Sequence, residues 1–211
     1  MSRVILVRHA QSEANRDNVS LGREDSPLTD LGRRQAAAVG DALRGERIVH
    51  VVTSPLARAY DTAAAIAQHH GLEPQADDRL LEMDVGELDG IPFEEARAKH
   101  ADFFREWIET EADALPMPGG ESVLDVATRA WPVLAELLEP GSGSDPDGTT
   151  VFVSHNFVIK GLLCQAIDLE LRCWRRFEVD LSSCSTLARR RGQVALYSLN
   201  DTAHLSPELR R

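Results

Sequence analysis

The sequence predicts an α/β protein with three layers (α/β/α), in which helices cover both faces of a mostly parallel central sheet. Short apolar runs rich in Val and Ile alternate along the chain with longer segments of helical period. Continuous apolar runs are typical of strands buried on both faces, and their alternation with helices indicates a parallel sheet. The 211 residues suffice for one domain with a small insertion.

Five segments have the composition of strands. They span residues 4–7, 48–53, 151–153, 185–188 and 194–199. The first three are short and β-branched, as expected for the interior of a parallel sheet. The last two are expected to pair with each other across a turn at Gly192.

Four segments have the period of amphipathic or buried helices. They span residues 29–43, 56–69, 122–138 and 157–167. Thr29 is a candidate N-cap of the first helix, and Gly71 a candidate C-cap of the second.

A helical insertion is expected at about residues 84–138 of the single domain 1–211, where it would overhang the sheet and any site at its edge. Its first part, residues 84–115, is rich in charges and contains several aromatic residues but has no strand pattern. Those aromatic side chains fit either the core of the insertion or an apolar wall above a substrate. Residues 140–148 are expected to form a flexible surface loop.

The overall charge restricts the partners. A formal net charge of −11 argues against nucleic acid and anionic membrane as general partners. No apolar run reaches the roughly 20 residues needed to span a bilayer, and the first residues do not resemble a signal peptide. A cytoplasmic location is therefore expected, and the oligomeric state is left open, with a homodimer as one option. No group of residues has metal-ligand spacing, so neither a metal nor a cofactor is expected.

Residues suited to binding phosphate follow the three clearest strands. Arg8 and His9 follow the first strand, residues 54–58 with Arg58 follow the second, and His155 with Asn156 follow the third. The carboxyl ends of parallel strands share one edge of the sheet, where open α/β folds bind ligands. We therefore expect these side chains to meet.

Arg58 has an unusual position. Ser54 is a candidate N-cap and Pro55 suits the first helical position, which places Arg58 in the first turn. A cation there opposes the helix dipole by roughly 0.3–1 kcal/mol, and a bound anion would reverse this penalty. Free N–H groups of the same turn would add to the anion site.

The composition of this cluster favours phosphoryl transfer. Two guanidinium groups can hold the phosphoryl oxygens, a neutral histidine can attack phosphorus, and a second histidine, when cationic, completes the electrostatic cage. The leaving oxygen also needs a proton, which a partly buried carboxylic acid can supply.

Six stretches extend this interpretation. They are residues 8–15 (RHAQSEAN), 26–36 (SPLTDLGRRQA), 54–63 (SPLARAYDTA), 80–86 (LLEMDVG), 119–122 (GGES) and 153–155 (VSH). Together they resemble, in order and over nearly the whole chain, the motifs of the histidine phosphatase superfamily, also called the phosphoglycerate mutase-like family. The resemblance implies that His9 is the phosphorylated nucleophile and Glu82 the proton donor, with Asp84 as the alternative donor among the nearby acids. The phosphate pocket that it implies consists of Arg8, Arg58, His155 and Asn15, and Asn156 is placed to reach toward the ligand.

Two positions depart from the family pattern. The family usually has glycine after the first histidine and often after the second, where this chain has Ala10 and Asn156. Alanine adds only a methyl group, so the pocket is expected to survive if the backbone at Ala10 has a negative φ.

The favoured function is hydrolysis of a small phosphorylated metabolite, such as a sugar phosphate or a phosphoglycerate-type compound. The stretch after Glu82 and the compact length resemble the phosphatase branch of the family. A phosphoglycerate mutase-type transferase and a non-catalytic phospho-ligand binding protein are the alternatives. A metal-dependent hydrolase is disfavoured because arginines in the pocket would repel a cation. Arg23 and Lys160 are candidates for contacting a second anionic group.

Overall fold

A six-stranded sheet forms the centre of the computed structural model, which describes residues 3–110, 112–139 and 148–210. Its order is β3-β2-β4-β1-β5-β6. The strands are β1 (Arg3–Arg8), β2 (Ile48–Thr53), β3 (Gln75–Ala76), β4 (Thr149–Ser154), β5 (Cys184–Arg190) and β6 (Gln193–Asp201). Strands β1 to β4 are parallel, whereas β5 and β6 form an antiparallel hairpin beside β1. The mostly parallel sheet and the hairpin are confirmed, and only the two-residue β3 was not expected.

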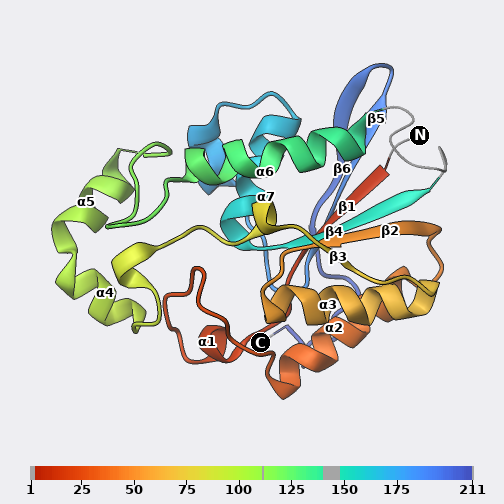
Figure 1. Ribbon diagram of the computed structural model, residues 1–211, viewed down its shortest axis with the longest axis horizontal. Coiled ribbons are helices and arrows are strands. Elements are labelled where there is room, and N and C mark those ends of the chain that lie inside the picture. The colour runs from red at the N-terminus through yellow and green to blue at the C-terminus, as the bar shows by residue number, and fades with distance from the viewer. Residues whose placement is uncertain (1–2, 111, 140–147, 211) are drawn as a thin grey trace.

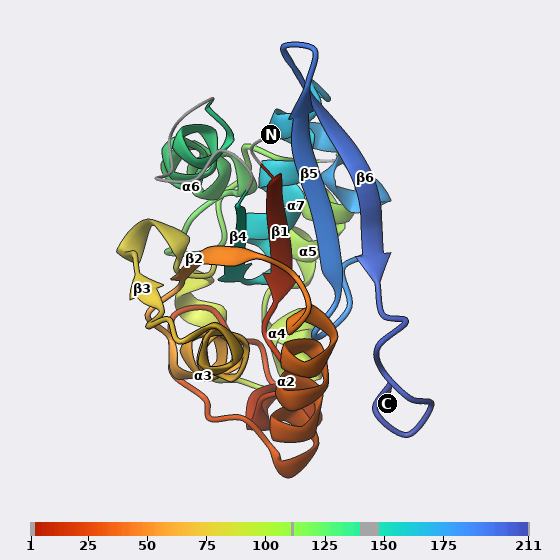
Figure 2. The same ribbon diagram turned by 90° about the vertical axis from the view of Figure 1, so that its right-hand side faces the viewer.

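Helices cover both faces of the sheet (Figures 1 and 2). Helices α2 (Asp30–Leu43) and α3 (Ala57–Ala67) lie on one face, and α6 (Val123–Leu138) and α7 (Asn156–Ala166) lie on the other. Alternate residues of β1 divide between these faces: Ile5 packs with the α2–α3 cluster and Leu6 with the α6–α7 cluster. The α/β/α layers that the sequence predicts are thus present.

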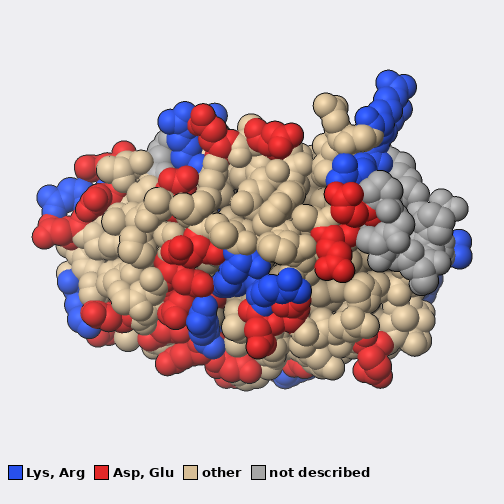
Figure 3. Space-filling model, turned by 45° about the horizontal axis from the view of Figure 1, so that its top comes forward, with Lys and Arg blue, Asp and Glu red and all other residues tan. Residues whose placement is uncertain are grey.

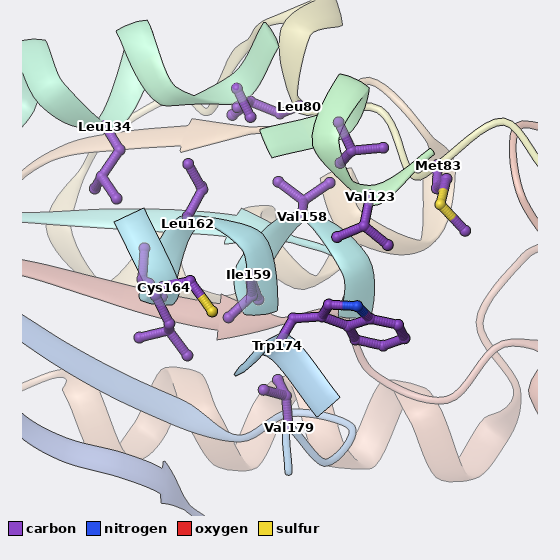
Figure 4. Packing of buried hydrophobic residues seen from close by; sticks show 14 of the residues in the cluster. Leu80, Met83, Val123, Leu134, Val158, Ile159, Leu162, Cys164, Trp174 and Val179 are labelled. Atoms are coloured by element: carbon purple, nitrogen blue, oxygen red, sulfur yellow. The ribbon is translucent and has the colours of Figure 1, made fainter. Parts of the chain in front are cut away.

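The larger core cluster lies under α6 and α7 (Figure 4). Val158 and Leu162 of α7 lie near Leu134 of α6 and Leu80 of the loop that precedes Glu82. All four side chains are fully buried, and each such burial stabilises the fold by about 1.5–3 kcal/mol. This packing fixes the start of α7 and the loop at Leu80 against the carboxyl ends of the strands.

Side-chain caps begin helices α2 and α6, and of these the sequence predicts only the cap at Thr29. The Thr29 hydroxyl accepts a hydrogen bond of 2.9 Å from the Gly32 amide, and Ser122 forms a capping box with Asp125. Helix α3 continues into a 3-10 turn, residues 68–70, that ends at Gly71 with φ of 65°. A left-handed backbone of this kind favours glycine.

Helices α4 (Phe93–Lys99) and α5 (Ala101–Glu109) lie beyond the carboxyl ends of the parallel strands (Figure 1). The aromatic rings of Phe104 and Trp107 pack against each other, and Trp107 also contacts Phe157 and Trp174. These rings therefore join the overhang to the main core. Helix α6, although within the segment 84–138, packs along α7 in the helical layer.

The surface reflects the acidic composition. On the face shown in Figure 3, acidic side chains border a group of basic ones near the centre, and further basic side chains lie at the margins of the view. No helix among the described residues is long and apolar enough to cross a membrane. The predicted loop at 140–148 falls, except for Gly148, outside the described residues.

Candidate active site

The ends of β1, β2 and β4 meet at one edge of the sheet. Arg8 pairs with Ser154 in the register of β1 and β4, and Thr53 pairs with Val153 in that of β2 and β4. The His9 amide donates to the Ser154 carbonyl at 2.9 Å, which extends the ladder by one residue. The structure therefore brings the residues that follow the three strands together, as their positions in the sequence predict.

His9 is oriented by its own backbone. Its side chain is buried, and its Nδ1 lies 2.8 Å from the Ala10 carbonyl oxygen. A carbonyl oxygen can only accept, so Nδ1 carries the proton of the neutral ring and Nε2 keeps its lone pair. Burial lowers the pKa of His9 well below its usual value, and the charges of Arg58 and Arg8 lower it further. His9 is thus a neutral imidazole with an available nucleophilic nitrogen.

Arg58 is fixed by backbone carbonyl groups of the loop that contains residues 22–24. Its guanidinium donates to the Gly22 carbonyl at 2.7 Å and to the Glu24 carbonyl at 3.0 Å. Arg8 similarly donates to the Val179 carbonyl at 2.6 Å. Within the described residues, the Nε atoms of both arginines are buried without a hydrogen-bond partner. Preorganised donors of this kind suit the oxygens of an anion.

His155 lies against His9 and ends the loop before α7. The two ring centroids are 5.0 Å apart, and His155 is the N-cap residue of α7. Burial, followed by the nearby charges of Arg58, His9 and Arg8, lowers the pKa of His155 well below its usual value. A cationic second histidine is expected from the sequence, but the lowered pKa of His155 favours its neutral form. It can still donate one N–H to a phosphoryl oxygen.

Glu82 is a buried carboxyl group near both arginines. Its carboxyl oxygens accept from the Met83 amide at 2.9 Å and, weakly, from the Phe157 amide at 3.5 Å. Burial raises the pKa of Glu82, although these amides and the charges of Arg58 and Arg8 oppose the rise. A carboxyl group with a raised pKa can hold the proton that a general acid must deliver.

The expected N-terminus of α3 was wrong. The helix begins at Ala57 after Leu56, whose side chain does not cap it, and the Ser54 hydroxyl accepts only a long hydrogen bond of 3.4 Å from the Leu56 amide. Instead, the Asp25 carboxylate accepts from the Ala57 amide at 3.0 Å. This acid from a distant loop satisfies an amide that the sequence reasoning assigned to the bound anion.

The two asparagines differ in how they are held. The Asn15 side-chain oxygen accepts from the Ser12 amide and hydroxyl in a capping box, which leaves its NH2 group for other contacts. Asn15 and Arg8 line a common cavity. Asn156 is the first residue of α7, partly exposed, and makes no side-chain hydrogen bond with the described residues. The structure therefore holds Asn15 in a fixed orientation beside Arg8, but not Asn156.

Ala10 fits where the family usually has glycine. The residue is fully buried, and its amide donates to the Thr62 hydroxyl at 3.0 Å. It is not among the residues with positive φ. The added methyl group packs with Leu28 and Ala36, so the backbone after His9 needs no glycine.

Sequence reasoning missed two acidic residues that support the site. The Asp89 carboxylate accepts from the amides of residues 22, 23 and 24, which belong to the loop that holds Arg58. The Glu121 carboxylate pairs with Arg129, which in turn donates to the Glu82 carbonyl at 2.9 Å. Glu121 lay in a recognised motif, but only the tertiary contacts reveal either role.

Among the described residues, no cluster of three His, Cys, Asp or Glu side chains is placed to hold a metal ion. Arg23, a candidate for a second anionic group, instead pairs with Glu121 at 3.1 Å and Asp84 at 3.6 Å. Lys160 lies 5.7 Å from the centre of the Trp174 ring.

The fold and the site define an α/β protein that gathers two histidines, two arginines and a buried acid at its strand ends. The chain belongs to the histidine phosphatase superfamily (branch 1), whose family profile matches residues 4–202.

Three relatives illustrate the range of this family. The chain is 33% identical over 205 residues to phosphoserine phosphatase 1 of Hydrogenobacter thermophilus, covering 97% of this chain and 95% of the relative. It is 35% identical over 185 residues to a probable phosphoglycerate mutase of Salmonella choleraesuis, covering 88% and 83%. A solved mycobacterial glucosyl-3-phosphoglycerate phosphatase, in complex with VO3, superposes with a TM-score of 0.86 at 31% identity, covering 96% of this chain and all of the other.

Proposed function

We propose that the chain hydrolyses small phosphomonoesters through a phosphohistidine intermediate on His9. The observation that carries the proposal is the pairing of a neutral His9 imidazole with a buried, protonatable Glu82 around one cationic pocket. Relatives named as phosphatases, and a neighbour solved with VO3, support it.

The first step transfers the phosphoryl group to the enzyme. Arg8 and Arg58 hold the phosphoryl oxygens, and His155 and Asn15 donate further hydrogen bonds. The Nε2 lone pair of His9 attacks phosphorus, a P–N bond forms, and the P–O bond to the leaving group breaks. Glu82 gives its proton to the leaving oxygen, so that a neutral alcohol departs.

The second step reverses these roles. The Glu82 carboxylate removes a proton from water, whose oxygen attacks phosphorus and breaks the P–N bond. Inorganic phosphate forms and Glu82 is protonated again, ready for the next cycle.

Helices α4 and α5 are proposed as a lid that limits access to this site. They lie beyond the strand ends, and the Asn18 carbonyl accepts from the Phe93 amide at 3.0 Å, next to the loop that holds Arg58. We assign only the part of the segment 84–138 that precedes α6 to the lid, because α6 packs on α7.

Turnover of p-nitrophenyl phosphate in the presence of a chelator tests the proposal. We expect steady phosphate release by the unaltered protein and none by His9→Ala. Incubation with labelled substrate and rapid acid-free denaturation should trap label on the unaltered protein alone. A His9→Ala protein with undiminished turnover would refute the mechanism.

A phosphoglycerate mutase is the second candidate, because one relative carries that name. The products distinguish a mutase from the proposed hydrolase. A mutase would interconvert 2- and 3-phosphoglycerate faster than it releases phosphate, whereas the proposed hydrolase releases phosphate from either. A binding protein would release none from any substrate.

A further inference from the structure

A cavity of about 420 Å³ adjoins the phosphate pocket, with which it shares Arg8 and Asn15. Its remaining walls include Gln35 of α2, Asp180 from the loop before β5, and Arg210. Because it shares Arg8 and Asn15 with the proposed phosphate pocket, the cavity is a candidate site for the organic part of a phosphomonoester. Arg210 and Asp180 bring opposite charges to it.

The segment 202–210 that carries Arg210 is held against the domain. The buried Gln35 side chain donates to the Leu209 carbonyl at 2.7 Å and accepts from the Gln11 amide at 2.9 Å. Leu205 of the same segment is buried. Figure 2 shows the chain after β6 running beside α2. The wall is thus tied to the loop that follows His9.

Arg210 brings a cation to this cavity. Its guanidinium donates to the Leu205 carbonyl at 2.9 Å and to the Thr202 carbonyl at 3.2 Å. No carboxylate of the described residues forms an ion pair with it. These backbone contacts orient the guanidinium while leaving its charge available, and its planar fork matches a carboxylate.

Asp180 brings the opposite charge. Its Oδ2 accepts from the Asn200 side chain at 2.9 Å, and its amide donates to the Asn200 side-chain oxygen at 2.7 Å. The carboxylate is near enough to Arg8 to affect the pKa of that guanidinium. One oxygen keeps its lone pairs available, because an ionised carboxylate has about four acceptor sites.

We propose that this cavity binds the amino-acid part of a small phosphorylated amino acid, with the carboxylate at Arg210 and the ammonium group at Asp180. The assignment deepens the proposed hydrolase and rests on it. A purely anionic group would be attracted by Arg210 but repelled by Asp180. A zwitterion complements both charges, so the pair selects for it and against simple anions.

Four substrates test the contact of the carboxylate with Arg210 and the contact of the ammonium group with Asp180 independently. L-phosphoserine carries both distal charges, 3-phosphoglycerate only the carboxylate, phosphoethanolamine only the ammonium group, and p-nitrophenyl phosphate neither. We expect the unaltered protein to have its highest kcat/KM among the three metabolites with L-phosphoserine.

Two variants give opposite changes in the ratios of kcat/KM. Arg210→Gln should lower the ratio of L-phosphoserine to phosphoethanolamine by about tenfold, the usual effect of losing a charged hydrogen bond. Asp180→Asn should lower the ratio of L-phosphoserine to 3-phosphoglycerate by about tenfold. Arg210→Lys keeps the charge but loses the planar fork of the guanidinium. Its ratio of L-phosphoserine to phosphoethanolamine should lie between those of the unaltered protein and Arg210→Gln.

Arg190→Gln and Asp41→Asn serve as charge-matched controls, because neither residue lines the cavity. They should leave both ratios unchanged. Equal losses for all four substrates in Arg210→Gln and Asp180→Asn, or ratios that do not move, would overturn the substrate assignment while leaving the hydrolase intact. Absence of turnover with all four substrates would instead refute the proposed function, and the assignment with it.

Discussion

The imidazole rings of His9 and His155 lie with their centroids 5.0 Å apart and their planes inclined by 58°. Two buried histidines at this distance, between two guanidinium groups, cannot both be protonated at low cost. Burial lowers the pKa of each ring and raises the pKa of Glu82. The shifts favour a neutral histidine beside a protonated carboxylic acid. This combination is scarce in water, because as pH rises an ordinary Glu loses its proton before an ordinary His does.

The first prediction concerns the acid limb of the pH profile. Catalysis needs neutral His9, so activity is lost as pH falls through the pKa of His9, which lies well below 6.5. We expect kcat/KM for p-nitrophenyl phosphate to remain undiminished as pH drops through 6.5 and to decline only below it. A pH–rate profile of the free enzyme measures this. An acid limb centred at or above 6.5 would contradict the lowered pKa.

The second prediction concerns Glu82 and the leaving group. Removing a general acid should slow alkyl phosphomonoesters by about 10²–10⁴-fold, since their alkoxide is a poor leaving group. p-Nitrophenolate leaves without a proton, so its release should be much less affected. We expect Glu82→Gln to reduce kcat/KM, which reports the first step alone, far more for an alkyl phosphate than for p-nitrophenyl phosphate.

Asp84→Asn provides the matched control for Glu82→Gln. Asp84 is close in sequence and its Oδ1 accepts from the Gly86 amide. It should show no such dependence on the leaving group. If Asp84→Asn showed it and Glu82→Gln did not, the proton donor would be Asp84.

The third prediction concerns Asp89 as a positioning residue. Its carboxylate accepts from three consecutive amides, and the carbonyls of the same loop hold Arg58. Asn offers one acceptor oxygen in place of two, so Asp89→Asn should loosen the loop. We expect kcat/KM to fall by about tenfold and vanadate inhibition to weaken by a similar factor.

A double-mutant cycle distinguishes positioning from a general loss of stability. If Asp89 acts through Arg58, Asp89→Asn should cost little further activity in an Arg58→Ala background. Glu94→Gln, on the exposed side of α4, should leave both measurements unchanged. Additive losses in the double variant would refute the positioning role.

The fold and the central site residues could be predicted because both follow from local patterns. Apolar runs identify strands, and parallel strands bring their carboxyl ends together, so Arg8 and His155 could be placed side by side before any coordinates were known. The family motifs added Glu82, whose loop has no strand or helix pattern of its own.

The remaining features depend on contacts between distant segments. Serine is a common N-cap residue, which favoured Ser54, yet the Asp25 carboxylate of another loop accepts the hydrogen bond from the amide at the start of α3. Asp89 is one of many acids in an acidic stretch, and nothing local marks its three amide contacts. Arg210 lies far along the chain from Arg8, and only the folding of the segment 202–210 onto α2 brings it to the same cavity.

The last prediction concerns Gly32, where α2 touches the loop that follows His9. A Cβ atom at this position would lie 2.0 Å from the Gln11 carbonyl oxygen, which is backbone and cannot turn away. Gly32→Ala should therefore displace the loop and lower the free energy of unfolding by about 1–3 kcal/mol. Because this loop also carries Ala10, whose carbonyl fixes the His9 ring, kcat/KM should fall as well.

Gly45→Ala is the control, since a Cβ atom at that position meets nothing within 4 Å. This substitution should change the free energy of unfolding by less than about 0.5 kcal/mol. Urea unfolding of both variants measures the difference, and equal stability would show that α2 and the loop do not constrain each other.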